Sequence, residues 1–249
     1  MELTEIFKHH ILDHTYTAIN IAGFTLPITK HLIMMWIAGL LLIFAIPILI
    51  KNSYFRSAIE AVVIFVRDEI VVSNMGEKHA KYTGYFCSLF FFILVCNLIG
   101  IVPFGATATG NISVTGALAL STFLFINFAG IKEHGLVGHV KSIAPQGIPW
   151  WLYPILFPIE LLSYVTKTFA LCIRLFANMI AGHFVLLSLI GMIFIFAKVS
   201  IVADLVVTVP FQIVMSVFIY LLEIFVAFLQ AYIFTVLTAI FTGAVLNPH

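Results

Sequence analysis

The stretch ELLSYVTKTFALCIRLFANMIAGH, residues 160–183, places ionisable side chains in an apolar run that no strong helix breaker interrupts. It lies within an arm of about residues 153–198, and a second apolar arm of about residues 204–246 follows a short break. As a helix, each arm would be roughly 65 Å long, whereas a perpendicular bilayer crossing needs only about 30 Å. Either each arm bends back on itself or both are tilted. Because no strong helix breaker interrupts the first arm, we favour two long, strongly tilted helices.

The composition explains why these arms must meet lipid. Hydrophobic residues make up 62% of the 249 residues and charged residues only 9%, against roughly 25% charged in an average soluble domain. A globule of this size cannot bury so much apolar surface, so the excess faces a lipid bilayer. The net charge of +1 excludes a nucleic-acid-binding protein, because phosphates require a basic surface.

Charged residues divide the first half of the chain into apolar spans. Residues 32–50 are free of charge and long enough for one crossing. Residues 51–81 mix charges with an apolar stripe, as in an amphipathic helix that lies at the membrane interface. Residues 82–131 are again free of charge, and turn residues near their middle predict a helical hairpin of about 84–103 and 113–131.

A polar loop of residues 132–149 leads from this hairpin to the two long arms. The sequence therefore predicts an all-α membrane protein. It would have five to six hydrophobic helices, an amphipathic interfacial helix and a C-terminal hairpin of two long, strongly tilted helices. We divide it into an outer N-terminal segment (1–31), a part with the first membrane helix, the interfacial helix and the helical hairpin (32–149), and the tilted hairpin (150–249). Lys and Arg number seven on one side and three on the other, which places the N-terminus outside and the C-terminus inside.

Glu160, Lys167 and Arg174 recur every seven residues, so on a helix they share one stripe. Small residues and Asn178 line the same stripe, which lets another helix approach closely. An arginine at the bilayer centre costs about 2.5–3.5 kcal/mol on insertion scales, so it is rarely there for packing. The structural alternative is that Arg174 pairs with Glu160 or Glu223 and only holds the helices together.

The two arms also match each other in register. An antiparallel hairpin that turns near residues 202–203 places Gln230 beside Arg174 and Glu223 beside His183. His183 lies about half a revolution around the helix from Arg174, so it belongs to a different environment. A histidine–glutamate pair within a membrane can relay protons, because both groups titrate when their surroundings shift them. The alternative is a buried ion pair that only adds stability.

Several motifs carry a family resemblance. Residues 174–179, RLFANM, together with residues 181–183, AGH, resemble the signature of subunit a of F-type ATP synthases. Residues 228–234, FLQAYIF, and residues 111–115, NISVT, resemble the same family. The similarity covers most of the chain and is weakest in residues 1–30.

The resemblance implies a mechanism. Subunit a is the membrane stator beside a rotating ring of c subunits, and its arginine, here Arg174, faces the ring and blocks short-circuiting protons. Two proton half-channels in the hairpin of residues 150–249 would serve the ring carboxylate, so that proton flow drives rotation and ATP synthesis. By motif position Gln230 is the family's glutamine and Asn178 belongs to the arginine motif. Glu160 matches an acidic position near the inner half-channel.

The resemblance also identifies a departure from the commonest pattern. Many bacterial members carry a carboxylate at the position of His183 and a histidine at that of Glu223. Here the two are exchanged, as in mitochondrial-type members. The exchange preserves the pair and leaves the order of proton transfer open.

Partners and location follow from the resemblance as well. We expect the c-ring, the b subunits of the peripheral stalk and the lipid bilayer as partners, without nucleic acid, cofactor or metal. The membrane would be an energy-coupling one, either the bacterial plasma membrane or the mitochondrial inner membrane, and the ring would decide between proton and sodium. The chain has no phosphate-binding glycine loop, so we expect it not to be catalytic alone.

The main alternative function is a secondary ion-coupled transporter, which also places ionisable residues at mid-membrane. Such transporters usually show repeated halves with interrupted helices. This sequence has no internal repeat, and its polar cluster is confined to the final third. Cys87, Cys96 and Cys172 lie in apolar stretches without C-x-x-C spacing, which predicts reduced thiols packed as small hydrophobic side chains.

Overall fold

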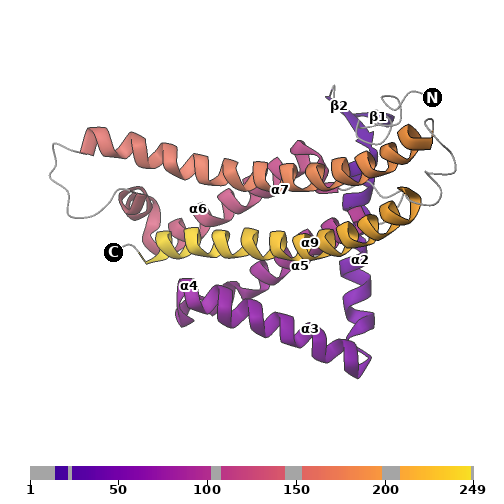
Figure 1. Ribbon diagram of the computed structural model, residues 1–249. Coiled ribbons are helices and arrows are strands. Elements are labelled where there is room, and N and C mark those ends of the chain that lie inside the picture. The colour runs from indigo at the N-terminus through magenta and orange to yellow at the C-terminus, as the bar shows by residue number, and fades with distance from the viewer. Residues whose placement is uncertain (1–14, 22–23, 102–107, 144–152, 198–207, 248–249) are drawn as a thin grey trace.

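The computed structural model describes residues 15–21, 24–101, 108–143, 153–197 and 208–247. Within these ranges the membrane part is built from long helices, as the sequence predicts (Figure 1). They are α2 (Lys30–Leu49), α5 (Thr83–Ile101), α6 (Ile112–Ile143), α7 (Tyr153–Ala197) and α9 (Val209–Leu246). Four stretches of the described residues are long and apolar enough to cross a membrane, namely Lys30–Leu49, Glu77–Ile101, Ile112–Gly135 and Val209–Leu246. The predicted all-α membrane architecture is confirmed.

α2 crosses the other long helices at a steep angle (Figure 1). Of its residues only Ala38 is buried, where it meets Cys96 of α5. Large apolar side chains such as Trp36 and Phe44 are exposed. Contact with lipid is more favourable for them than contact with water. The 20 residues of α2 span about 30 Å, which suits a direct crossing. The steep angle between α2 and the hairpin therefore supports the strong tilt that the lengths of α7 and α9 predict.

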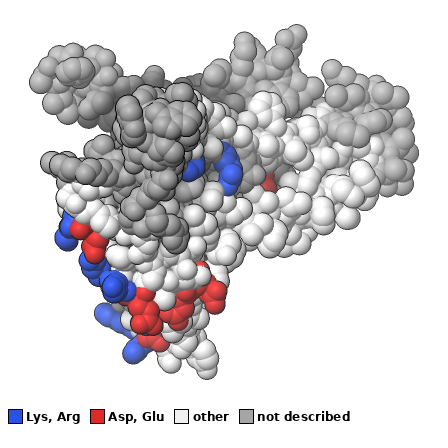
Figure 2. Space-filling view, turned by 90° about the vertical axis from the view of Figure 1, so that its left-hand side faces the viewer, with Lys and Arg blue, Asp and Glu red and all other residues white. Residues whose placement is uncertain are grey.

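A charged helical segment, here called the interfacial segment, connects α2 to α5. It consists of α3 (Ser53–Phe65), the π-helix η1 (Val66–Val72), the short helix α4 (Ser73–Met75) and the 3-10 helix η2 (Glu77–Tyr82). The side chain of Asn52 caps α3 by accepting a hydrogen bond from the backbone N–H of Tyr54 at 3.2 Å. In Figure 2 most of the Lys, Arg, Asp and Glu side chains that are visible gather in the lower part of the molecule, where this segment lies. The arrangement agrees with the predicted amphipathic helix at the interface.

The core lies where α5, α6 and α9 meet. Phe86 and Phe90 of α5 and Phe234 of α9 are fully buried there. Phe125 of α6 stacks on Tyr85, with ring centroids 3.7 Å apart, and meets Phe86 edge-to-face at 5.8 Å. Such aromatic pairs attract one another beyond the effect of buried area. The cluster fixes α9 against the α5–α6 hairpin and leaves another side of α9 for α7.

Polar side chains inside this core bond within their own helix. Thr235, Thr238 and Thr242 of α9 are buried, and each hydroxyl donates to the carbonyl oxygen four residues earlier at 2.6–2.8 Å. A buried hydroxyl without a partner is costly. Because these three hydroxyls are satisfied within α9, they can be buried in the core without partners on the neighbouring helices.

One polar contact links separate elements at the other end of α5. Buried Asn97 accepts a hydrogen bond from Thr109 Oγ1 at 2.9 Å and donates to the carbonyl oxygen of Ala227 at 3.4 Å. Thr109 belongs to the 3-10 helix η3 (Ala108–Gly110). Asn97 therefore joins α5, η3 and α9 at one point.

Two features differ from the sequence-based prediction. The N-terminal segment contains an antiparallel hairpin of β1 (Thr15–Ile21) and β2 (Phe24–Thr29), where no strand is predicted. The predicted loop of residues 132–149 is wrong in its first part, because α6 continues to residue 143 beyond a break at Gly135. Gly135 has a φ of 70°, a conformation that glycine adopts without steric cost. The turn predicted near residues 202–203 lies outside the described residues.

α9 approaches α4 so closely at Gly243 that a Cβ there would collide with the backbone carbonyl oxygen of Asn74. We expect Gly243→Ala to destabilise the folded chain by about 1–3 kcal/mol, because a backbone neighbour cannot turn aside. Gly39→Ala is the matched control, since nothing lies within 4 Å of a Cβ at that helical position and alanine favours a helix by about 0.5–1 kcal/mol. Thermal unfolding of the purified chain in detergent measures both. Equal midpoints for the two variants would contradict the close approach.

Candidate functional site

α7 presents two different faces. One face packs into the protein through Leu171, Cys172, Leu175 and Met179, which are all buried. Arg174 lies away from that face, and its side chain is exposed without an ion-pair partner among the described residues. The helix therefore holds the guanidinium at its surface while its other side is fixed in the protein.

The contacts between α7 and α9 have the antiparallel register expected from the sequence. Glu223 of α9 lies directly against Gly182 of α7, since a Cβ on Gly182 would be 2.5 Å from Glu223 Oε1. Further along the pair, Lys167 Nζ lies 5.6 Å from the ring centroid of Phe241, a cation–π contact. Both contacts agree with one hairpin that turns near residues 202–203.

This register separates the guanidinium from the carboxylate. Glu223 lies opposite Gly182, eight residues beyond Arg174, which is about 12 Å along the helix. The alternative in which Arg174 pairs with Glu223 is therefore wrong. Lys167, one heptad before Arg174, is also exposed, as the predicted stripe requires.

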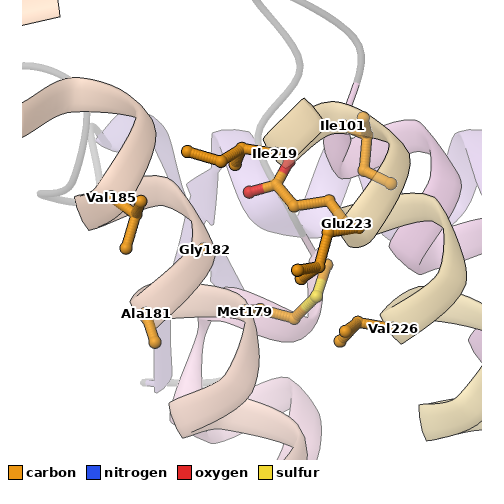
Figure 3. A pocket seen from close by; sticks show the side chains of 9 residues that line it. Ile101, Met179, Ala181, Gly182, Val185, Ile219, Glu223 and Val226 are labelled. Carbon is orange, nitrogen blue, oxygen red and sulfur yellow. The ribbon is translucent and has the colours of Figure 1, made fainter. Parts of the chain in front are cut away.

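A cavity of about 310 Å³ lies between α7, α9 and the end of α5, and Glu223 forms part of its wall (Figure 3). Its other walls are mostly apolar and include Met179 and Val185 of α7 and Ile219 and Val226 of α9. Glu223 Oε2 is buried and has no hydrogen-bond partner among the described residues. A carboxylate oxygen in such surroundings is costly unless it binds a proton, water or a cation. The cavity therefore offers a place where a proton can be taken up and released.

Two buried amides lie on the same face of α9 as this carboxylate. Gln230 is 4% exposed and Gln212 is 2% exposed. They are 18 residues apart, which is five full helical turns, and Glu223 lies within about 20° of the same line. The side-chain oxygen and nitrogen of Gln212 have no hydrogen-bond partner among the described residues. Gln212 is not among the residues predicted for the site from the sequence, although its spacing of 18 residues from Gln230 is a signal that the sequence contains.

Glu160, Asn178 and His183 have side chains outside the described part of the structure, and their contacts stay predictions. Their backbones belong to α7. His183 directly follows Gly182, the residue that Glu223 contacts. The structure thus brings Glu223 to the position along α7 that the predicted pair requires.

The NISVT motif of residues 111–115 has a structural part in this arrangement. Asn111 accepts a hydrogen bond from the backbone N–H of Ser113 at 2.9 Å at the start of α6, as a helix-capping residue does. Thr115 Oγ1 lies 3.4 Å from Cys172 Sγ on the packed face of α7. The motif therefore both begins α6 and docks it against α7.

The described residues contain no group of three or more His, Cys, Asp and Glu side chains that could hold a metal ion. The site instead combines a carboxylate in a mostly apolar cavity, buried amides on one helical face and an exposed guanidinium. These groups can exchange, orient and repel protons.

Known proteins share these features over most of the chain. The family model described as ATP synthase A chain matches residues 32–243. ATP synthase subunit a 2 of Prosthecochloris aestuarii is 44% identical, with 96% of this chain and 78% of the relative covered. ATP synthase subunit a of Myxococcus xanthus is 45% identical, with 88% and 72% covered. On this match the chain belongs to the ATP synthase subunit a family, and it is a multi-pass membrane component of that complex.

Proposed function

We propose that this subunit is the membrane stator that forms two proton half-channels and presents Arg174 to a rotating ring of c subunits. Proton flow would then drive rotation and ATP synthesis. The observation that carries the proposal is Glu223 at the cavity between α7 and α9, with Arg174 exposed about 12 Å away along α7. The arrangement separates a proton-exchanging group from a fixed cation along one route. As one component of the complex, the chain is not catalytic alone.

Arg174 serves as the electrostatic barrier in this mechanism. A ring carboxylate that crosses an apolar surface must be protonated, and it ionises where a fixed cation stabilises its anion. A guanidinium suits this task because it keeps its own proton, whereas a desolvated lysine can lose it. Arg174 has no ion-pair partner in the described part of this chain. It therefore remains available to a carboxylate of another subunit.

The outer half-channel follows the polar face of α9 in this proposal. It leads past Gln212, whose amide has no partner within the described ranges and offers hydrogen bonds to water, and it reaches Glu223 and its cavity. His183, next to the contact residue Gly182, exchanges protons with Glu223. In this proposal the two groups are neighbours, so they titrate as one unit rather than as separate sites.

The inner half-channel lies beyond Arg174 on the other side. Glu160 accepts or releases protons there, and Lys167, held over the ring of Phe241, adds a second cation on the same stripe. Gln230 and Asn178 act between the two half-channels. Their amides can hydrogen-bond the guanidinium and the ring carboxylate without adding a group that titrates.

The partners follow from the same arrangement. The c-ring contacts the exposed edge of α7, and the b subunits of the peripheral stalk hold the stator in place. Exposed apolar side chains of α2, among them Trp36 and Phe44, contact lipid. The membrane is an energy-coupling one, of a bacterium or a mitochondrion.

The barrier is tested at Arg174. Arg174→Ala should abolish ATP-driven proton pumping while the subunit still assembles, because no fixed cation is left to receive the ring carboxylate. Arg174→Lys should be nearly as inactive, since a desolvated ammonium can lose its proton. Pumping is measured in membrane vesicles by quenching of a pH-sensitive dye, with subunit content checked by immunoblot. Normal coupled pumping by Arg174→Lys would refute the assignment.

The proton-exchanging pair is tested by swapping its members. His183→Glu and Glu223→His should each slow proton uptake from the outer side, because each leaves two like groups in low dielectric. The double variant restores one acid and one base at the same contact, so it should transport more than either single variant. Proton flux is recorded at several pH values. A double variant no better than the worse single variant would show that the two residues do not work together.

The cavity is tested at Gly182. Gly182→Ala places a methyl group against the carboxylate of Glu223, and we expect proton flux to fall several-fold without a leak. The matched control is Gly116→Ala on α6, where a Cβ would lie an ordinary 4.0 Å from Cys172 Sγ. Flux through vesicles and assembly of the subunit are compared for both variants. Wild-type flux in Gly182→Ala would show that Glu223 does not act from this contact.

A further inference from the structure

A second cluster of titratable side chains lies at the interfacial segment, away from the α7–α9 site. His79 in η2 is 4% exposed, yet its Nε2 has no hydrogen-bond partner among the described residues. Its Nδ1 lies 3.2 Å from the carbonyl oxygen of Met75. A carbonyl only accepts hydrogen bonds, so Nδ1 carries the hydrogen of the neutral ring and Nε2 is left as the bare nitrogen.

The bare nitrogen faces a carboxylate. Nε2 lies 3.9 Å from Glu133 Oε1 on α6, while Lys81 Nζ lies 3.8 Å from Oε2 of the same carboxylate. Two acceptors that face each other do not bind. Protonation of Nε2 turns it into a charged donor aimed at Glu133, which forms one of the stronger kinds of hydrogen bond.

Charged and polar groups of η2, α4 and α6 surround the ring of His79. From its own element, Lys78 and Lys81 oppose a positive charge on the ring, and Tyr82 stacks on it with centroids 6.3 Å apart. Glu133 of α6 favours the positive charge. α4 contributes a backbone carbonyl to the ring rather than a charge. Burial of the ring opposes its positive charge more strongly than either lysine does, and Glu133 is the group that favours this charge.

The cluster is connected to the C-terminal end of α9. The carbonyl of Met75 that faces His79 also accepts a hydrogen bond from Asn247 Nδ2 at 3.1 Å. On the other side, His134 Nε2 lies 3.0 Å from the carbonyl oxygen of Leu246. The last turn of α9 is thus held both by α4 and by α6. His79 contacts the first of these two hydrogen-bonded sites through Met75, and Glu133 directly precedes His134 of the second.

We propose that His79 and Glu133 form a proton-binding site that fastens the C-terminal end of α9 when the pH at the interfacial segment falls. With Nε2 bare, Lys81 is the cation that holds Glu133 among the residues that the structure describes. With Nε2 protonated, Glu133 also bonds the buried ring, and α6 and η2 are drawn together around the end of α9. Because α9 carries Glu223 and Gln230, the site adjusts how firmly the proposed proton route is held. It rests on contacts separate from that route, and its test does not depend on proton transport.

The test measures how often the last turn of α9 opens. Val245 is buried in that turn, so a cysteine placed there reacts with a thiol reagent only when the turn opens. The parent protein carries Val245→Cys, with Cys87, Cys96 and Cys172 changed to Ala, in the assembled complex in membrane vesicles. Because burial opposes protonation of the His79 ring, the parent protein's rate of modification is measured about one pH unit above and about one and a half pH units below the usual histidine pKa of about 6.5. Each rate is divided by that of the same protein with His79→Gln, which cancels the effect of pH on the thiol itself.

We expect this ratio to fall about two- to fivefold from the alkaline to the acidic condition, as for an ion pair of ordinary strength. Glu133→Gln should remove the fall, because it leaves no anion for the ring. Lys81→Gln should keep it, because this change leaves both His79 and Glu133 in place.

The carboxylate of Glu133 is 39% exposed, so Glu133→Gln leaves the buried ring in place. If His79→Gln does not assemble, the modification rate of the parent protein is divided by that of Glu133→Gln instead, and the same fall is expected. A ratio that stays constant with pH would overturn the proposal. A fall that persists in Glu133→Gln would do so as well, because the pH dependence would then come from groups other than the pair of His79 and Glu133.

Discussion

The close approach of α7 and α9 at Gly182 is the constraint on which the rest of the site depends. Because Gly182 has no side chain, the carboxylate of Glu223 lies directly against α7. In an antiparallel pair one such contact sets the neighbours along both helices, and the contact of Lys167 with Phe241 agrees with it. A carboxylate at an apolar cavity is costly. It persists because the helices that carry it are held firmly elsewhere.

α9 provides that firmness through only half of its length. Toward its C-terminal end, Ala231, Phe234 and Ala239 are buried in the core with α5 and α6. Toward its N-terminal end, side chains such as Phe218 and Phe225 are exposed. Glu223 lies at the border between the two halves. The buried half therefore orients the helix, while the exposed half leaves room for the cavity beside α7.

The long hairpin and its register are predictable from the sequence for specific reasons. Ionisable residues at seven-residue spacing define a stripe on α7. In addition, Gln230 lies as far after the predicted turn as Arg174 lies before it, and Glu223 matches His183 in the same way. Gln212 was equally detectable from its spacing. The contacts of Gly182 and Phe241 then agree with this register.

The packing of the remaining helices is not predictable in this way. α5 is apolar around its whole circumference, so periodicity does not indicate which side meets Phe125 or Phe234. The continuation of α6 was missed because Lys132 and Glu133 resemble a loop, whereas a helix at the interface carries such charges easily. The pair of His79 and Glu133 joins residues 54 positions apart, and no local pattern indicates it.

Arg174 is exposed and has no ion-pair partner among the described residues. This exposure supports the idea that another protein covers this side of α7. Lipid around an arginine at mid-membrane costs about 2.5–3.5 kcal/mol or more, and apolar Phe169 and Ile173 are exposed near it on α7. An anion on another protein removes this cost, and the dry surroundings strengthen the attraction. Such a pair would be permanent unless the anion can take up a proton and leave. In the proposed mechanism that proton comes from a nearby supply, and the cavity at Glu223 lies about 12 Å away along the same hairpin. The same mechanism assigns the cation the task of keeping protons from that supply from passing straight through the subunit, so the proposal needs both the exposed cation and the cavity.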